Sequence, residues 1–112
     1  MATITHKQLG QTRPASTTAA SVYSPAASTQ AIIKTIVIAE TLGGAAAYSV
    51  FFDDDGTTYD ETTAIAFGVA IAANTTVTLS GFYAMNDSTG NLAVKTDTND
   101  ALTFTVFGAE IT

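Results

Sequence analysis

The chain has 112 residues, 46% of them hydrophobic, which is enough for one domain with a packed core and excludes a disordered chain. Its formal net charge of −6 argues against a nucleic-acid ligand, because neutralising phosphates requires Lys and Arg. The sequence contains no cysteine, which excludes disulfides and thiolate chemistry.

Residues 1–18 are polar and show no clear period, so we expect an extended N-terminal arm. Such an arm becomes ordered only against another surface, either its own body or a neighbouring copy. Its two isolated branched aliphatic residues and its two cations are the candidates for binding a partner: Ile4, Lys7, Leu9 and Arg13. All ten acids lie in residues 19–112, so a cationic arm on an acidic body could dock on an acidic neighbour. Removal of residues 1–13 should then leave the melting temperature of the body nearly unchanged.

Short runs with strand character follow the arm at fairly even spacing, which is typical of a β-sandwich or barrel. The expected strands are residues 19–24, 31–40, 46–53, 57–66, 68–71, 75–80, 91–96 and 102–112. A bulge at Gly81 would carry the run 75–80 on to residue 85. In the run 31–40, Ile32, Ile36 and Ile38 are expected on one face and Ile33 on the other, both faces being covered. No segment is expected to be helical.

The last strand has the clearest pattern. Leu102, Phe104 and Val106 alternate with Thr103 and Thr105, the period of a strand with one buried and one wet face. The sequence therefore predicts an all-β fold: a single antiparallel β-sandwich of seven to eight strands, jelly-roll-like. The arm would comprise residues 1–18 and the sandwich domain residues 19–112.

The composition also indicates subunit contacts. The chain contains 21 Thr and 20 Ala, whereas only 12% of its residues are charged. Threonine suits a half-buried pleated surface. A surface of hydroxyls and small side chains costs little to desolvate, so we expect extensive contacts between subunits.

The densest group of ionisable residues lies within residues 53–61. Asp53, Asp55 and Asp60 are weak candidates for calcium ligands, because an EF-hand spacing would place Phe51 at the first ligand position. An acidic hairpin turn is the preferred interpretation, with Gly56 supplying a positive φ. No metal and no cofactor are therefore expected.

Two further kinds of site are weighed against structural roles. A catalytic triad needs a positioned histidine, and the sole one, His6, lies in the arm, so no enzyme activity is expected. A sugar-stacking platform could use the four tyrosines, although packing is the preferred role for them. These tyrosines are Tyr23, Tyr48, Tyr59 and Tyr83.

Several short motifs together resemble a known group of proteins. They are Leu9-Gly10-Gln11, Pro14-Ala15, and the segments 22–26, 36–38, 71–76 and 107–112. With these motifs, most of the chain resembles small virion structural proteins of tailed bacteriophages. The resemblance implies a β-sandwich that assembles, commonly as a trimer, on capsids or in tail and fibre structures.

The expected function is that of a capsid decoration (cement) protein, a homotrimer that stabilises the head shell through arm and sheet-edge contacts. Its partners would be itself and the major capsid protein or another virion protein, without nucleic acid or membrane. No apolar run of about 18 residues and no signal-peptide pattern is present, so it would be made in the host cytoplasm. The resemblance implies that it then resides in the virion. Two alternatives stay open: a tail, neck or fibre-associated component, and a carbohydrate-binding module that uses Tyr59, Tyr83 and the acidic loop 53–61.

Overall fold

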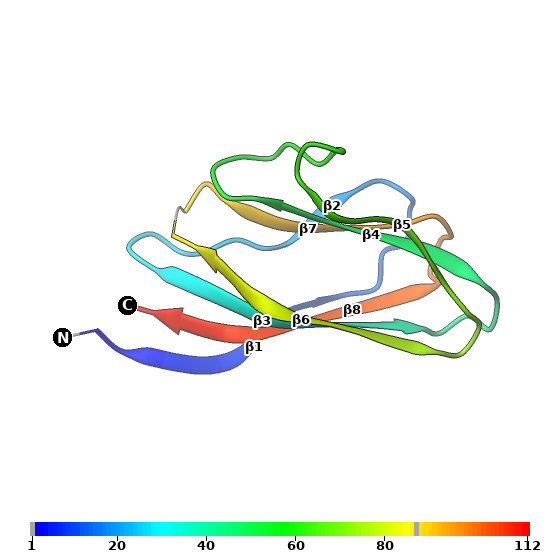
Figure 1. Cartoon of the computed structure of the whole chain (residues 1–112), viewed down its shortest axis with the longest axis horizontal. Coiled ribbons are helices and arrows are strands. Elements are labelled where there is room, and N and C mark those ends of the chain that lie inside the picture. The colour runs from blue at the N-terminus through cyan, green and yellow to red at the C-terminus, as the bar shows by residue number, and fades with distance from the viewer. Residues whose placement is uncertain (1, 87) are drawn as a thin grey trace.

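The computed structural model describes residues 2–86 and 88–112, which form two antiparallel sheets packed face to face (Figure 1). Sheet A contains, in spatial order, β1 (Ile4–Thr12), β8 (Leu102–Ile111), β3 (Gln30–Glu40) and β6 (Thr76–Met85). Sheet B contains β2 (Ala20–Tyr23), β7 (Asn91–Thr96), β4 (Ala46–Asp53) and β5 (Ala64–Ile71). Met1 of the expected arm and Asp87 of an expected loop lie outside the described residues.

The strand order is that of a jelly roll. The first strand pairs with the last, β2 with β7, β3 with β6, and β4 with β5, all antiparallel. The chain is thus one long hairpin whose successive strand pairs lie alternately in sheet A and sheet B, which wraps it into two Greek keys. The predicted all-β, jelly-roll-like sandwich is confirmed.

The core lies between the sheets, and β8 contributes to it as predicted. Leu102, Phe104 and Val106 are 0% exposed, whereas Thr103 and Thr105 on the other face are half-buried. Side chains from both sheets complete the cluster. They include Ile33, Ile36, Ile38 and Met85 from sheet A and Tyr48, Val50, Ile71, Leu92 and Val94 from sheet B.

The predicted phase of β3 was wrong at two residues, Ile32 and Ile33. Ile33, and not Ile32, joins Ile36 and Ile38 in the core, and Ile32 is half-buried on the outer face. The reason is a bulge at Lys34. Ile33 pairs with Gly108 of β8 and Thr35 pairs with Phe107, the adjacent residue, so Lys34 has no partner of its own on β8. An extra residue in one strand reverses the facing of everything beyond it.

Another bulge was predicted correctly, whereas one strand was not. Tyr83 and Ser80 pair with Ile33 and Thr35, so Gly81 and Phe82 lie together opposite one residue of β3, and β6 continues to Met85.

The expected strand 57–66 was wrong in its first part. Residues 54–63 form a loop, and β5 is one strand that joins the end of that run to the expected run 68–71.

The N-terminal segment forms a strand that its lack of period did not reveal. Residues 4–12 form β1, which pairs with β8 from Ile4↔Ile111 to Thr12↔Phe104. Of the two surfaces considered for the arm, the structure therefore places it on its own body. At Gly10 an added Cβ would lie 2.5 Å from the carbonyl oxygen of Val22, so glycine permits β1 to approach β2 of the other sheet.

Candidate assembly surface

Asp53, the last residue of β4, and Asp60 shape the loop 54–63 that follows. The carboxylate of Asp53 accepts hydrogen bonds from the backbone amides of Thr58 at 2.9 Å and Asp55 at 3.2 Å. These amides, Thr58 first, hold the pKa of Asp53 below its usual value. Asp60 accepts from the amide of Thr62 at 2.8 Å. Within residues 2–86 and 88–112, no three His, Cys, Asp or Glu side chains are grouped so that they could hold a metal ion.

The expectation for Gly56 was wrong. Its φ lies outside the left-handed region, which in this chain is occupied by Gly43 and Gly68 among the described glycines. Instead, a Cβ at Gly56 would lie 3.1 Å from a carboxylate oxygen of Asp53, so the glycine makes room for the side chain that closes the loop.

The tyrosines do not form one platform. Tyr23 and Tyr48 are buried. Tyr59 lies over Phe51, with ring centroids 6.4 Å apart, and Tyr83 lies against Phe52 at the same separation. Because Phe51 and Phe52 are consecutive in β4, their side chains point to opposite faces of sheet B. Tyr59 and Tyr83 are therefore on different faces, which weakens the expected sugar-binding face.

The four arm residues proposed to bind a partner have different surroundings. Leu9 packs against the core, Lys7 forms an ion pair with Glu110, and Arg13 donates through Nε to the carbonyl oxygen of Asp100 at 2.9 Å. Ile4 is 61% exposed. Their role in binding a partner stays a prediction.

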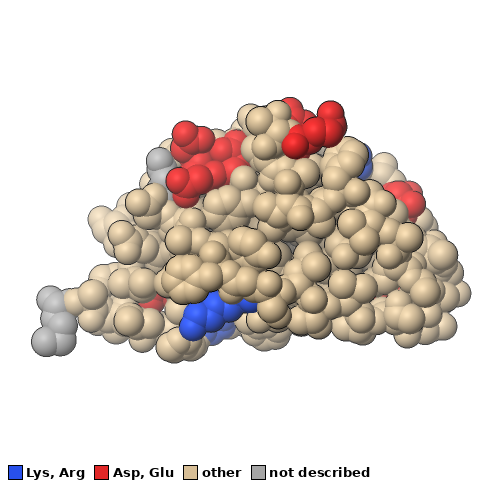
Figure 2. Space-filling view, viewed as in Figure 1, with Lys and Arg blue, Asp and Glu red and all other residues tan. Residues whose placement is uncertain are grey.

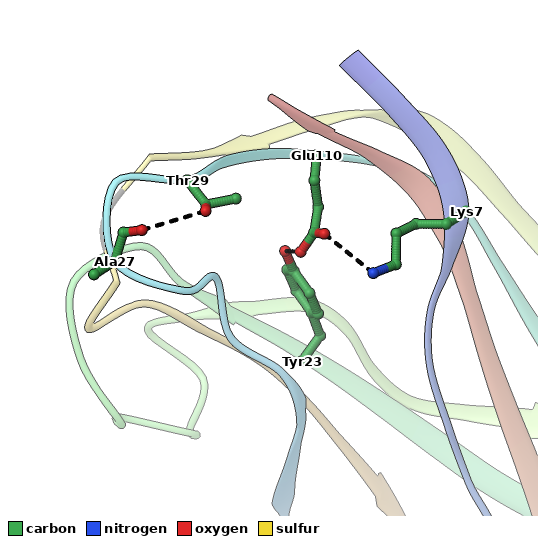
Figure 3. A network of polar contacts seen from close by, with 5 residues as sticks. All are labelled: Lys7, Tyr23, Ala27, Thr29 and Glu110. Atoms are coloured by element: carbon green, nitrogen blue, oxygen red, sulfur yellow. Dashed lines mark hydrogen bonds and ion pairs between the residues drawn. The ribbon is translucent and has the colours of Figure 1, made fainter. Parts of the chain in front are cut away.

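A polar network joins the two sheets on the side formed by β1 and β2 (Figure 3). The hydroxyl of Tyr23 on β2 donates to Oε2 of Glu110 at 2.7 Å, and Nζ of Lys7 on β1 lies 3.2 Å from Oε1 of the same carboxylate. The Tyr23 hydrogen bond and the Lys7 charge lower the pKa of Glu110, whereas burial and the carboxylate raise the pKa of Tyr23. We call this side of the sandwich the closed side.

The network predicts a pH-dependent stability. Since the folded-state pKa of Glu110 is lowered, its stabilising contribution is present above the ordinary glutamate pKa of about 4.3 and is lost as the pH falls through the folded value. Glu110→Gln should therefore lower the free energy of unfolding at pH 7 by roughly 0.5–1 kcal/mol. The difference from the wild type should shrink at pH 2–3.

Urea unfolding of both proteins at the two pH values measures this effect. Glu61→Gln, a change of the same kind in the exposed part of the loop 54–63, is the matched control. A Glu110→Gln deficit of equal size at both pH values would show that the ionised carboxylate contributes nothing.

The opposite side of the sandwich, formed by β5 and β6, is open. Val69 is paired with the core residue Tyr48 but is 40% exposed, and Val77 and Leu79 of β6 are only half-buried. Phe82 of β6 is 69% exposed. Phe67 of β5 is 53% exposed and lies against Phe51 on the outer face of sheet B, with ring centroids 6.3 Å apart. Apolar side chains are therefore presented to solvent along both strands, which we call the open side.

The open side also lacks charge. Residues 62–86, which include all of β5 and β6, contain no Asp, Glu, Lys, Arg or His. In the view of Figure 1, β5 and β6 face the viewer, and Figure 2 shows that most acidic side chains lie along the top and that cationic ones lie at the bottom and at the upper right. The band between top and bottom is largely uncharged. The acidic side chains at the top lie over the β4–β5 connection.

Edge strands are normally protected against pairing with other chains by charge, shortness or irregularity. On the closed side β1 carries Lys7, and β2 has only 4 residues. On the open side β5 is interrupted by register shifts and by the positive φ of Gly68. Strand β6 carries no charge, and its residues 76–80, before the bulge at Gly81 and Phe82, are regular, so this segment is the least protected edge among the described strands. Sequence reasoning missed this surface, although the uncharged stretch 62–86 was a visible signal.

Comparison with known proteins supports the fold. The chain is similar to a chain in the structure of infectious bursal disease virus, Gx strain, with a TM-score of 0.52 and 13% sequence identity. The similarity covers 99% of this chain and 31% of the viral chain, so the protein corresponds to about a third of that chain's length. At this identity the likeness shows a shared fold. No protein-family model and no curated protein sequence matches the chain.

No helix in the described part of the chain is long and apolar enough to cross a membrane.

Proposed function

We propose that the protein is a non-enzymatic virion structural protein, and specifically a capsid decoration protein of a tailed bacteriophage. In this role it binds an assembled shell and adds buried surface between neighbouring subunits. Repetition over a symmetric lattice turns modest individual contacts into a large total avidity. Its partners are other copies of itself and a protein of the particle.

The observation that carries the proposal is the uncharged, apolar open side. Large exposed apolar patches mark interaction sites on soluble proteins, and a long unprotected edge strand is a template for pairing with another chain. Val69 and Phe82 are exposed on this side, at 40% and 69%, and no ring contact in the described residues covers either of them.

The fold is compatible with this function without establishing it. Jelly rolls occur in viral capsid and lectin domains, and the similar chain belongs to the structure of a virus. That virus is not a tailed phage, so the assignment to a phage rests on the motif resemblance. Since folds host many functions, the proposal depends on the surface described above.

Two other roles remain as alternatives. A tail, neck or fibre component would use the same open side in a different part of the particle. A carbohydrate-binding module would use Tyr59 and the acidic loop, but the structure separates Tyr59 from Tyr83 and leaves no shared aromatic platform.

Co-sedimentation with expanded heads of a tailed phage that lack decoration protein tests the proposal. The wild type should bind at a fixed ratio to the shell subunit, and Phe82→Ser on the open side should reduce binding at least tenfold. Phe107→Ser is the matched control, because it removes an exposed phenyl group from the outer face of sheet A. Ile4→Ser reports the contribution of the arm.

Two results would count against the proposal. Absence of binding to heads, combined with binding to a glycan array, would favour the carbohydrate module. Equal losses for Phe82→Ser and Phe107→Ser would show that the open side is not the surface that docks on the particle.

A further inference from the structure

Strand β6, the edge of sheet A on the open side, has a regular segment that ends at the bulge of Gly81 and Phe82. Residues 76–80 of β6 alternate, with Thr76, Thr78 and Ser80 exposed on the outer face and Val77 and Leu79 half-buried toward the core. The segment therefore reads hydroxyl, apolar, hydroxyl, apolar, hydroxyl, and it has the same character in both directions along the strand.

From this pattern we infer that β6 pairs with β6 of a second copy, antiparallel, about a two-fold axis through Thr78. Sheet A would become a continuous eight-stranded sheet across the two copies. Thr78 would face Thr78 of the partner subunit, Thr76 would face Ser80, and Val77 would face Leu79. Cross-strand pairs between hydroxyl residues and between apolar residues are those that stabilise antiparallel sheets.

The ends of β6 fit the same arrangement. The pairing about Thr78 would bring Phe82 of one copy opposite position 74 of the other. The backbone amides of Asn74 and Leu42 are both bound by the carboxylate of Glu40, at 2.9 Å and 3.0 Å, so Leu42 lies at this same end of the strand. Leu42 is 55% exposed and Phe82 is 69% exposed. The two-fold axis would place these apolar residues near each other, twice per dimer.

The charge distribution identifies the occupant as a second copy. Two chains of net charge −6 repel each other unless their acidic groups are kept apart. The acids of the loop 54–63 lie along the top in Figure 2, away from β6. Strand β6 itself carries no charge, and Lys34 of β3 lies opposite its bulge. A contact between two copies of one surface must be complementary to itself, and an uncharged strand with this alternation satisfies that condition.

This inference goes beyond the proposed function, because it concerns the isolated protein and requires no particle. It also differs from the homotrimer that the family resemblance implied, which stays an untested prediction.

A single engineered cysteine tests the pairing, since the chain has no other. Residues directly opposite each other in an antiparallel pair have Cβ atoms about 4.5–5.5 Å apart, which is close to disulfide geometry. Thr78→Cys should therefore be converted to a covalent dimer under mild oxidation at low protein concentration. Gln8→Cys, exposed on the opposite edge of the same sheet, should cross-link at least tenfold more slowly.

Thr78→Lys provides a second, non-covalent measurement. Two lysines would face each other at the axis, and the variant should be monomeric by sedimentation, whereas Gln8→Lys should associate like the wild type. Equal cross-linking of both cysteine variants, or a Thr78→Lys protein that associates like the wild type, would overturn the inference. Loss of particle binding with this dimer intact would instead contradict the proposed function alone.

Discussion

Replacement of Phe104 with alanine is expected to lower the free energy of unfolding by about 3–5 kcal/mol, the cost typical of removing a buried phenyl ring. Phe104 is 0% exposed and lies near the start of β8, between Thr12 of β1 and Ile38 of β3. Strand β8 has neighbours on both sides, so the cavity cannot collapse by a shift of an edge strand. The loss should appear as a lower urea midpoint with an unchanged slope.

Phe107→Ala on the same strand is the matched control. Its side chain is 40% exposed on the outer face of sheet A, so its removal should cost less than about 1 kcal/mol. Similar losses for the two variants would refute the facing of β8 and the position of the core.

Deletion of residues 1–13 has the second large expected effect. Strand β1 is bonded to β8 along its length, and Leu9 packs against the core. Burial of a leucine side chain contributes about 2 kcal/mol, so the melting temperature should fall by about 10 °C or more. This expectation replaces the one drawn from the sequence, in which an arm without its own surface could be removed at no cost.

Leu9→Ala and Ile4→Ala separate the causes of that effect. Leu9→Ala should reproduce most of the loss, whereas Ile4→Ala should leave stability nearly unchanged because the side chain is 61% exposed. A truncated protein as stable as the full chain, measured by thermal unfolding, would mean that β1 does not lie on its own body in solution.

The fold could be predicted well because strands of a β-sandwich have a recognisable alternation of apolar and polar residues. The alternation of Leu102, Phe104 and Val106 predicted which face of the last strand is buried, and Gly81 marked a bulge that the structure contains. Bulges without a glycine were not foreseeable: Lys34 reverses the phase of β3 although nothing in the sequence distinguishes it. Strand β1 was missed since its edge position leaves most of its side chains exposed, which removes the period that reveals a strand.

The candidate surface could not be predicted from residue types that carry chemistry, because it contains none. Sequence reasoning favoured the charges of the arm, yet Lys7 is paired with Glu110 on the same chain. The relevant signal was the missing charge of residues 62–86, and its meaning depends on topology. The strand order shows that β5 and β6 are both edges, and Figure 1 shows them on the same side of the sandwich.

Light scattering of the isolated wild-type protein over a range of concentrations tests most directly whether the uncharged open side joins copies of this chain. We expect a mass of twice the 11.5 kDa chain at high concentration, and the mass of one chain for Thr78→Lys. A mass of one chain at every concentration, or of three chains, would contradict the two-fold pairing of β6.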